Sequence, residues 1–195
     1  FYAFRLASDI EAPSWHQDEL PSRQLPVLVL TDGWDTFLGI DPVASTVRRG
    51  VAARTRNRLQ QDVLVPYLLG ARWFADKGRP IERVEFVEHG EWQTPQGQWL
   101  MALIEVTFRD GGPPQRYFLP LAIGWDDALS DHKRHAVLGW ALARVREKAR
   151  VGVLHTALGD EDFCRALLLG IDGNLRLPLG AGEVVFRATG AVGDL

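Results

Sequence analysis

The chain has 195 residues, of which 46% are hydrophobic and 24% charged, and its formal net charge at pH 7 is -3. This length suits one folded domain with a sizeable core, and the composition excludes a chain that is disordered throughout. The small negative charge excludes a general attraction to nucleic-acid backbones or anionic membranes, so any anion site must be local.

The single cysteine, Cys164, excludes an intrachain disulfide. No activating histidine or cation is evident beside it, so we expect a buried structural thiol. No apolar run approaches the roughly 20 residues of a membrane helix, and the first residues do not resemble a signal peptide. We therefore expect a cytoplasmic protein. Because the sequence starts at Phe1 in the middle of a pattern, we also expect a piece of a longer polypeptide.

The first 33 residues contain two short strand patterns. Apolar side chains alternate over residues 2–6, which predicts a half-buried strand. Residues 7–26 carry three prolines and no periodicity, which predicts a linker. Residues 27–30 predict a short apolar strand, and residues 31–33 predict the turn that ends it.

Residues 45–64 predict an amphipathic helix with Ser45 as its N-cap. Its apolar positions are spaced by multiples of four: Val47, Val51, Leu59 and Val63. Its outer face carries five arginines: Arg48, Arg49, Arg54, Arg56 and Arg58. A solvated helix face explains these arginines better than a nucleic-acid site, because no aromatic residues for base stacking lie among them. Pro66 is expected to end or kink the helix.

An antiparallel hairpin is predicted after residue 80. A strand begins near Val84 and is expected to break at Gly90. Residues 99–108 form a second strand that is apolar on both faces, which predicts cover on both sides. Residues 110–114 predict a tight reversal, and residues 117–123 alternate on the return.

The last third is partly ambiguous. Residues 137–145 fit a strand and a helix equally well, and so short a run does not decide between them. The acidic residues 160–162 predict the N-cap and first turn of a helix that ends near Gly170. Residues 184–188 suggest a last strand.

The sequence contains no recognisable catalytic pattern. Nucleophile turns, dinucleotide-binding loops and Walker-type phosphate loops are all missing from it. His132 and His135 would share a helical face, but a third metal ligand at a recognisable spacing is lacking. The acidic runs 126–127 and 160–162 have no partner that would separate their pKa values for acid–base catalysis. We therefore expect no catalytic residue, metal site or cofactor in this chain.

The segment Arg72–Ile81, RWFADKGRPI, is the most informative part of the sequence. It places two large aromatic residues, three cations and a glycine between a helix pattern and a strand pattern. Packing alone does not explain this mixture, because Trp and Phe favour burial whereas Arg and Lys favour water or an anion. The candidate interface or ligand contacts are Arg72, Trp73, Phe74, Lys77, Gly78 and Arg79.

Two interpretations of this segment remain open. In the first, the aromatic residues form a platform flanked by cations, which meets a sugar ring, a phosphate or a partner's acidic surface. In the second, it is a helix-to-strand connection: Trp73 and Phe74 fill the core, Gly78 adopts a backbone angle that other residues avoid, and the cations cap carbonyl groups.

The runs VPYLLGARWFADKGRPI and GVLHTALGDEDFCRALL resemble the amino-terminal cap region of bacterial maltokinases, over roughly residues 25–195. Thr156 departs from the family pattern, which usually has Asp there. The first residues, FYAFRL, resemble the closing strand of the carboxy-terminal β-domain of trehalose synthases. This order implies a fusion in which residues 1–24 are the last synthase strand and a linker, residues 25–130 the cap, and residues 131–195 its continuation toward the kinase amino-terminal lobe.

The resemblance implies an α+β fold in which a curved antiparallel sheet packs against a helix, as in a cystatin-like cap, with a further helix and strand on the carboxy-terminal side. It also implies that the parent enzyme uses ATP and Mg²⁺ to phosphorylate maltose to maltose 1-phosphate. The phosphate loop, lysine and catalytic segment of the family would lie beyond Leu195. A non-catalytic cap is therefore implied for this chain.

The implied partners are the kinase lobes of the same polypeptide and the preceding trehalose synthase domain. Maltose is implied as the substrate of the parent, and neither nucleic acid nor membrane is expected as a partner. The alternative function is a carbohydrate-binding module that stacks sugar rings on Trp73, Trp92 or Trp99, because the chain contains seven tryptophans.

Overall fold

The computed structural model describes residues 25–31, 33–35 and 46–188. The strand expected at residues 2–6, most of the expected linker and the expected N-cap Ser45 lie outside the described residues. Among the described residues, no helix is both long enough and apolar enough to cross a membrane. The proposed division into domains stays a prediction.

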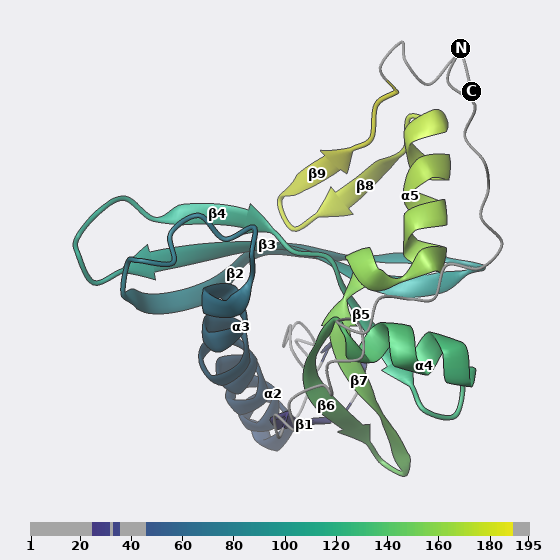
Figure 1. Ribbon diagram of the computed structural model, residues 1–195, viewed down its shortest axis with the longest axis horizontal. Coiled ribbons are helices and arrows are strands. Elements are labelled where there is room, and N and C mark those ends of the chain that lie inside the picture. The colour runs from purple at the N-terminus through teal and green to yellow at the C-terminus, as the bar shows by residue number, and fades with distance from the viewer. Residues whose placement is uncertain (1–24, 32, 36–45, 189–195) are drawn as a thin grey trace, which may run out of the picture.

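A strongly curled sheet of seven strands forms the body of the molecule (Figure 1). The strands are β1 (Val27–Leu30), β2 (Ile81–Thr94), β3 (Gly97–Phe108), β4 (Gln115–Phe118), β5 (Leu121–Trp125), β6 (Ala141–Glu147) and β7 (Arg150–Thr156). Their order is β1-β6-β7-β5-β3-β2, with β4 also paired to β3. All pairs are antiparallel except β1 with β6. The predicted α+β fold, with a curved and mainly antiparallel sheet against a helix, is confirmed.

Strand β2 is longer than the sequence predicted. The expected break at Gly90 is wrong, because β2 continues through this residue to Thr94. A Cβ atom at Gly90 would collide with the carbonyl oxygen of Pro178. Glycine is therefore needed here for the close approach of another strand, and it does not end β2.

One continuous helical segment packs against the sheet. It consists of α2 (Thr46–Arg58), a π-helical turn (Leu59–Leu64) and α3 (Val65–Gly70). The prediction that Pro66 ends the helix is wrong, since Pro66 lies in the first turn of α3, where its missing N–H is tolerated. The alternative, that Pro66 kinks the helix, stays a prediction. The widened π-helical turn comes just before it.

The predicted apolar face of this helix is only partly confirmed. Leu59 and Val63 are buried, as expected. Val47, in the first turn of α2, is 75% exposed, contrary to the prediction. The residues that this helix contributes to the core therefore lie in its carboxy-terminal half.

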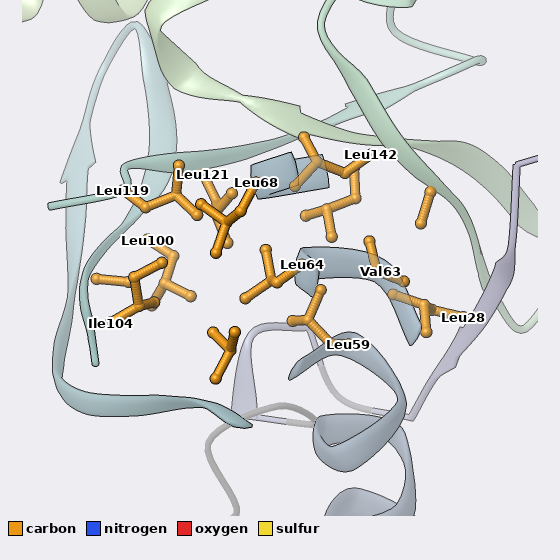
Figure 2. Close-up of a cluster of buried hydrophobic side chains, with 14 of the residues drawn as sticks. Leu28, Leu59, Val63, Leu64, Leu68, Leu100, Ile104, Leu119, Leu121 and Leu142 are labelled. Atoms are coloured by element: carbon orange, nitrogen blue, oxygen red, sulfur yellow. The ribbon is translucent and has the colours of Figure 1, made fainter. Parts of the chain in front are cut away.

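The main core lies between this helical segment and one face of the sheet (Figure 2). Side chains from the helices, from the central strands and from β1 and β6 meet there, all nearly inaccessible to solvent: Leu28, Leu59, Val63, Leu64, Leu68, Leu100, Ile104, Leu119, Leu121 and Leu142. Burial of such apolar surface is the dominant favourable contribution to folding.

A second core lies on the other face of the sheet, and it confirms that β3 is covered on both sides. Trp99 and Met101 of β3 pack there with Phe163 and Ala166 of α5 (Glu161–Asp172). The rings of Trp92, Trp99 and Phe163 lie with their centroids 5.4–5.9 Å apart in tilted or edge-on contacts.

The ambiguous residues 137–145 contain both kinds of element. Helix α4 (Asp131–Leu138) ends just before β6 begins. The helix predicted from the acidic residues is confirmed as α5, in which the Asp160 side chain accepts a hydrogen bond from the backbone N–H of Asp162. Cys164 of this helix is exposed, contrary to the prediction of a buried thiol, because it lies on the outer side of α5.

A small hairpin follows α5. It consists of β8 (Arg176–Leu179) and β9 (Gly182–Val185). The last strand predicted at residues 184–188 overlaps β9, whereas β8 was not predicted. The carboxy-terminal elements pack on the second core through Leu179 and Phe186.

Candidate interface at residues 72–79

The candidate segment is a series of tight turns between α3 and β2. Helix α3 ends as the Ala71 N–H donates to the carbonyl oxygens of Tyr67 and Leu68. The Phe74 N–H then donates to the Ala71 carbonyl at 3.2 Å, and the Arg79 N–H donates to the Asp76 carbonyl at 3.0 Å. The segment is therefore a helix-to-strand connection, as the second interpretation of the sequence expected.

The two aromatic residues of the segment have different environments. Phe74 is 1% exposed and belongs to the main core, with its ring centroid 5.2 Å from that of Tyr117. Trp73 is 46% exposed, and its ring lies 5.7 Å from that of Tyr117 and 6.3 Å from that of Tyr67. Phe74 therefore fills the core, as predicted, while half of Trp73 faces solvent.

Arg79 fixes the segment to the β3–β4 turn. Its guanidinium donates two hydrogen bonds to the Asp110 carboxylate, at 2.7 and 2.9 Å, and one to Asp76 at 3.2 Å. It also lies over the Phe108 ring, 3.7 Å from the centroid. The hydrogen bonds from Arg79 lower the pKa of Asp110 to about 2, and those to Asp110 raise the pKa of Arg79.

Asp76 and two glycines complete this arrangement. The Tyr117 hydroxyl donates to Asp76 at 2.8 Å, and burial together with this bond raises the pKa of Tyr117 to about 12. Gly111 has a φ of 74°, in the left-handed region that favours glycine. A Cβ atom at Gly112 would collide with the Arg79 guanidinium. The β3–β4 turn is therefore shaped to receive Arg79.

The predicted contacts thus separate into two groups. Arg72 and Lys77 are exposed, and neither makes an ion pair within the part of the chain that the structure describes. Arg79 binds carboxylates, so the expectation that it caps backbone carbonyls is wrong. Gly78 is also corrected, since its φ is not in the left-handed region and the space around its Cα is open.

The accessible part of the segment is therefore a surface of three residues, Arg72, Trp73 and Lys77, which we call the Trp73 surface. It combines an aromatic ring with two cations that are not neutralised by the chain's described part. Asp76, Asp110 and Tyr117 hold the turns behind it, and the sequence did not single them out. Asp110 was recognised only as part of a reversal.

Two of the three tryptophans suggested as sugar platforms are not available. Trp92 and Trp99 are 5% and 1% exposed, because both rings are packed in the second core. The Trp99 indole N–H donates to Asp160 at 2.9 Å. Only Trp73 of these three presents a face to solvent.

Thr156, the residue that departs from the family pattern, ends β7. It is 1% exposed, and its hydroxyl oxygen has no hydrogen-bond partner within normal distance. It lies inside the sheet and not on the Trp73 surface. Across the described ranges, no group of three or more His, Cys, Asp or Glu side chains is placed to hold a metal ion.

The sequence was compared with models of known protein families. Residues 67–160 match the family model of the maltokinase N-terminal cap domain. This part of the chain is similar to maltokinase N-terminal cap domains. The match covers just under half of the chain and contains the Trp73 surface, the Arg79 pairs and strands β2 to β7. Comparison with curated proteins and with solved structures gave no match.

Proposed function

We propose that the chain is a non-catalytic cap that shapes or regulates the kinase amino-terminal lobe of a cytoplasmic maltokinase. The match of residues 67–160 to the cap family carries this proposal. In this role the kinase lobes of the same polypeptide bind ATP, Mg²⁺ and maltose and form maltose 1-phosphate. A trehalose synthase domain precedes the cap in the same polypeptide, which places both activities on one chain.

The Trp73 surface is the part of the cap that we propose to contact the kinase lobe. Tryptophan and arginine are the residues most enriched among the dominant contacts of protein interfaces. Arg72 and Lys77 are exposed on either side of Trp73 in the sequence and have no carboxylate partner in the described ranges. An acidic or aromatic surface on the lobe would therefore complement all three side chains.

The proposal is tested in the whole polypeptide by the double variant Trp73→Ala with Lys77→Glu. We expect a several-fold lower rate of ATP-dependent maltose phosphorylation, because the cap loses an aromatic contact and reverses a charge at the lobe. Lys148→Glu, at the turn between β6 and β7, is the matched control and is expected to leave the rate unchanged. Equal rates in the double variant and the control would contradict a contact at the Trp73 surface.

A further inference from the structure

A cavity of about 320 Å³ lies on the opposite side of the cap from the main core. It opens to solvent and is lined by α4, by the amino-terminal end of α5, by β5 and β7, and by Gln96 of the turn between β2 and β3. This volume is at the lower end of the range for small-molecule sites, roughly 300–1,000 Å³. None of residues 72–79 lines the cavity, so it is separate from the Trp73 surface.

Gly124 lets three side chains pack directly onto the backbone of β5 at the floor of the cavity. A Cβ atom at this position would lie 2.9 Å from a methyl group of Leu129, 3.4 Å from one of Val137 and 3.6 Å from Nε2 of His155. These three side chains converge over the bare backbone of β5. The floor of the cavity is therefore mostly apolar, and its one polar atom near Gly124 is Nε2 of His155.

His155 presents an unsatisfied acceptor at this floor. Its side chain is 2% exposed, and Nδ1 lies 2.9 Å from the carbonyl oxygen of Thr156. A carbonyl only accepts hydrogen bonds, so Nδ1 carries the proton and Nε2 has a free lone pair. Nothing in the described part of the chain donates to Nε2. A ligand hydroxyl group that reaches Nε2 from the cavity therefore gains a hydrogen bond that the described residues do not supply.

Burial also lowers the pKa of His155, which keeps the imidazole neutral at pH 7. The neutral ring accepts at Nε2, whereas a charged ring would donate there. This protonation state agrees with the tautomer that the Thr156 carbonyl imposes.

The rim of the cavity carries both acceptors and donors. The Glu161 side chain is 78% exposed beside it, and the Lys133 ammonium contacts Asp162 at 2.6 Å. Asp160 is already used by the fold, since it caps α5 and accepts from Trp99. Asp162 pairs with Lys133 and Arg165, and Glu161 pairs with Arg165, so the charges at the rim are largely balanced and favour a neutral ligand. The described residues also offer no cluster of three metal ligands.

We propose that this cavity binds a small neutral polyol, such as a sugar ring, with one hydroxyl group donating to Nε2 of His155. Hydroxyl groups both donate and accept, so they match Glu161 and Lys133 at the rim as well as the acceptor at the floor. The apolar floor suits the C–H face of a ring. This site goes beyond the proposed function, because it belongs to the cap and requires no kinase lobe.

The direct test is a titration of the 195-residue chain with glucose, maltose, trehalose and glycerol, and separately with inorganic phosphate. The ¹⁵N resonance of His155 Nε2 reports whether a donor reaches this atom. We expect a saturable shift with at least one of the four polyols and none with phosphate. A resonance that does not move with any polyol at high millimolar concentration, or that moves only with phosphate, would overturn the proposal.

Substitutions at the floor and rim of the cavity test whether the polyol binds there. Gly124→Ala narrows the floor and is expected to weaken polyol binding roughly tenfold, which is the scale of one lost buried hydrogen bond. Glu161→Gln removes a rim charge from an exposed position, so it leaves the fold intact and is expected to weaken binding a few-fold. Asp172→Asn, at the other end of α5, is the matched control. Affinity that is unchanged in both Gly124→Ala and Glu161→Gln would overturn the proposed location.

Discussion

Phe74 and Trp73 are neighbours in the chain with opposite exposure, which gives a prediction at the scale of single residues. Phe74→Ala empties part of the main core and is expected to lower the free energy of unfolding by about 3–5 kcal/mol. Trp73→Ala removes a ring that is 46% exposed and is expected to cost about 1 kcal/mol. Urea unfolding of the two variants measures both values, and equal losses would contradict the burial described above.

Asp110 makes a contribution to stability that depends on pH. Arg79 lowers the pKa of this carboxyl group to about 2 in the folded chain, from its ordinary 3.8. A folded pKa below the unfolded one means that the contribution is complete above pH of about 4 and is lost as the pH falls toward 2. Asp110→Asn is therefore expected to flatten the fall in stability with acid. Urea unfolding of both proteins between pH 3 and pH 6, in roughly unit steps, checks this, and parallel curves would exclude the role given to Asp110.

Gly90 and Gly78 allow a comparison at the scale of elements, because a Cβ atom would collide with a neighbouring strand at Gly90 and meet open space at Gly78. Gly90→Ala pushes a methyl group against the backbone of β8, so we expect a loss of about 1–3 kcal/mol in the free energy of unfolding. Gly78→Ala meets open space and needs no left-handed backbone, so we expect no loss and a gain of up to about 1 kcal/mol. Thermal unfolding ranks the two. A Gly90→Ala variant as stable as the wild type would show that β8 does not lie against β2.

The elements that the sequence predicted well have a strong local signal. Strand β3 has alternating apolar residues on both faces, and α5 has an acidic cap at Asp160. Strand β8 was missed because it is only four residues long and contains Pro178, which argues against a strand in sequence. The break expected at Gly90 was wrong because the reason for that glycine is a contact with Pro178, distant in sequence.

The candidate site was harder to predict than the fold, for the same physical reason. The motif itself identified the correct turn, but the side chains that fix it come from elsewhere in the chain. Asp110 is 31 residues from Arg79, and Tyr117 is 41 residues from Asp76. No local pattern reports such pairs, because they depend on the path of β3 and β4. His155 was similarly visible as a residue, while its cavity depends on α4, β5 and α5 together.

At the scale of the whole molecule, one curled sheet carries two cores on its two faces. The Trp73 surface lies beside the first core and the His155 cavity beside the second. A lobe that contacts the first surface therefore need not cover the cavity. Residues 67–160, which match the family model of the maltokinase N-terminal cap domain, contain the Trp73 surface and almost all of the cavity lining.

We propose that this chain serves a maltokinase and that the residues for phosphoryl transfer lie in other parts of the same polypeptide. The measurement that tests it most directly is the formation of maltose 1-phosphate from ATP and maltose by the whole polypeptide and by the isolated 195-residue chain, with ATP binding followed by calorimetry. We expect the whole polypeptide to form maltose 1-phosphate. We expect the isolated chain to form none and to show no saturable ATP binding. Product formation or saturable ATP binding by the isolated chain would contradict it.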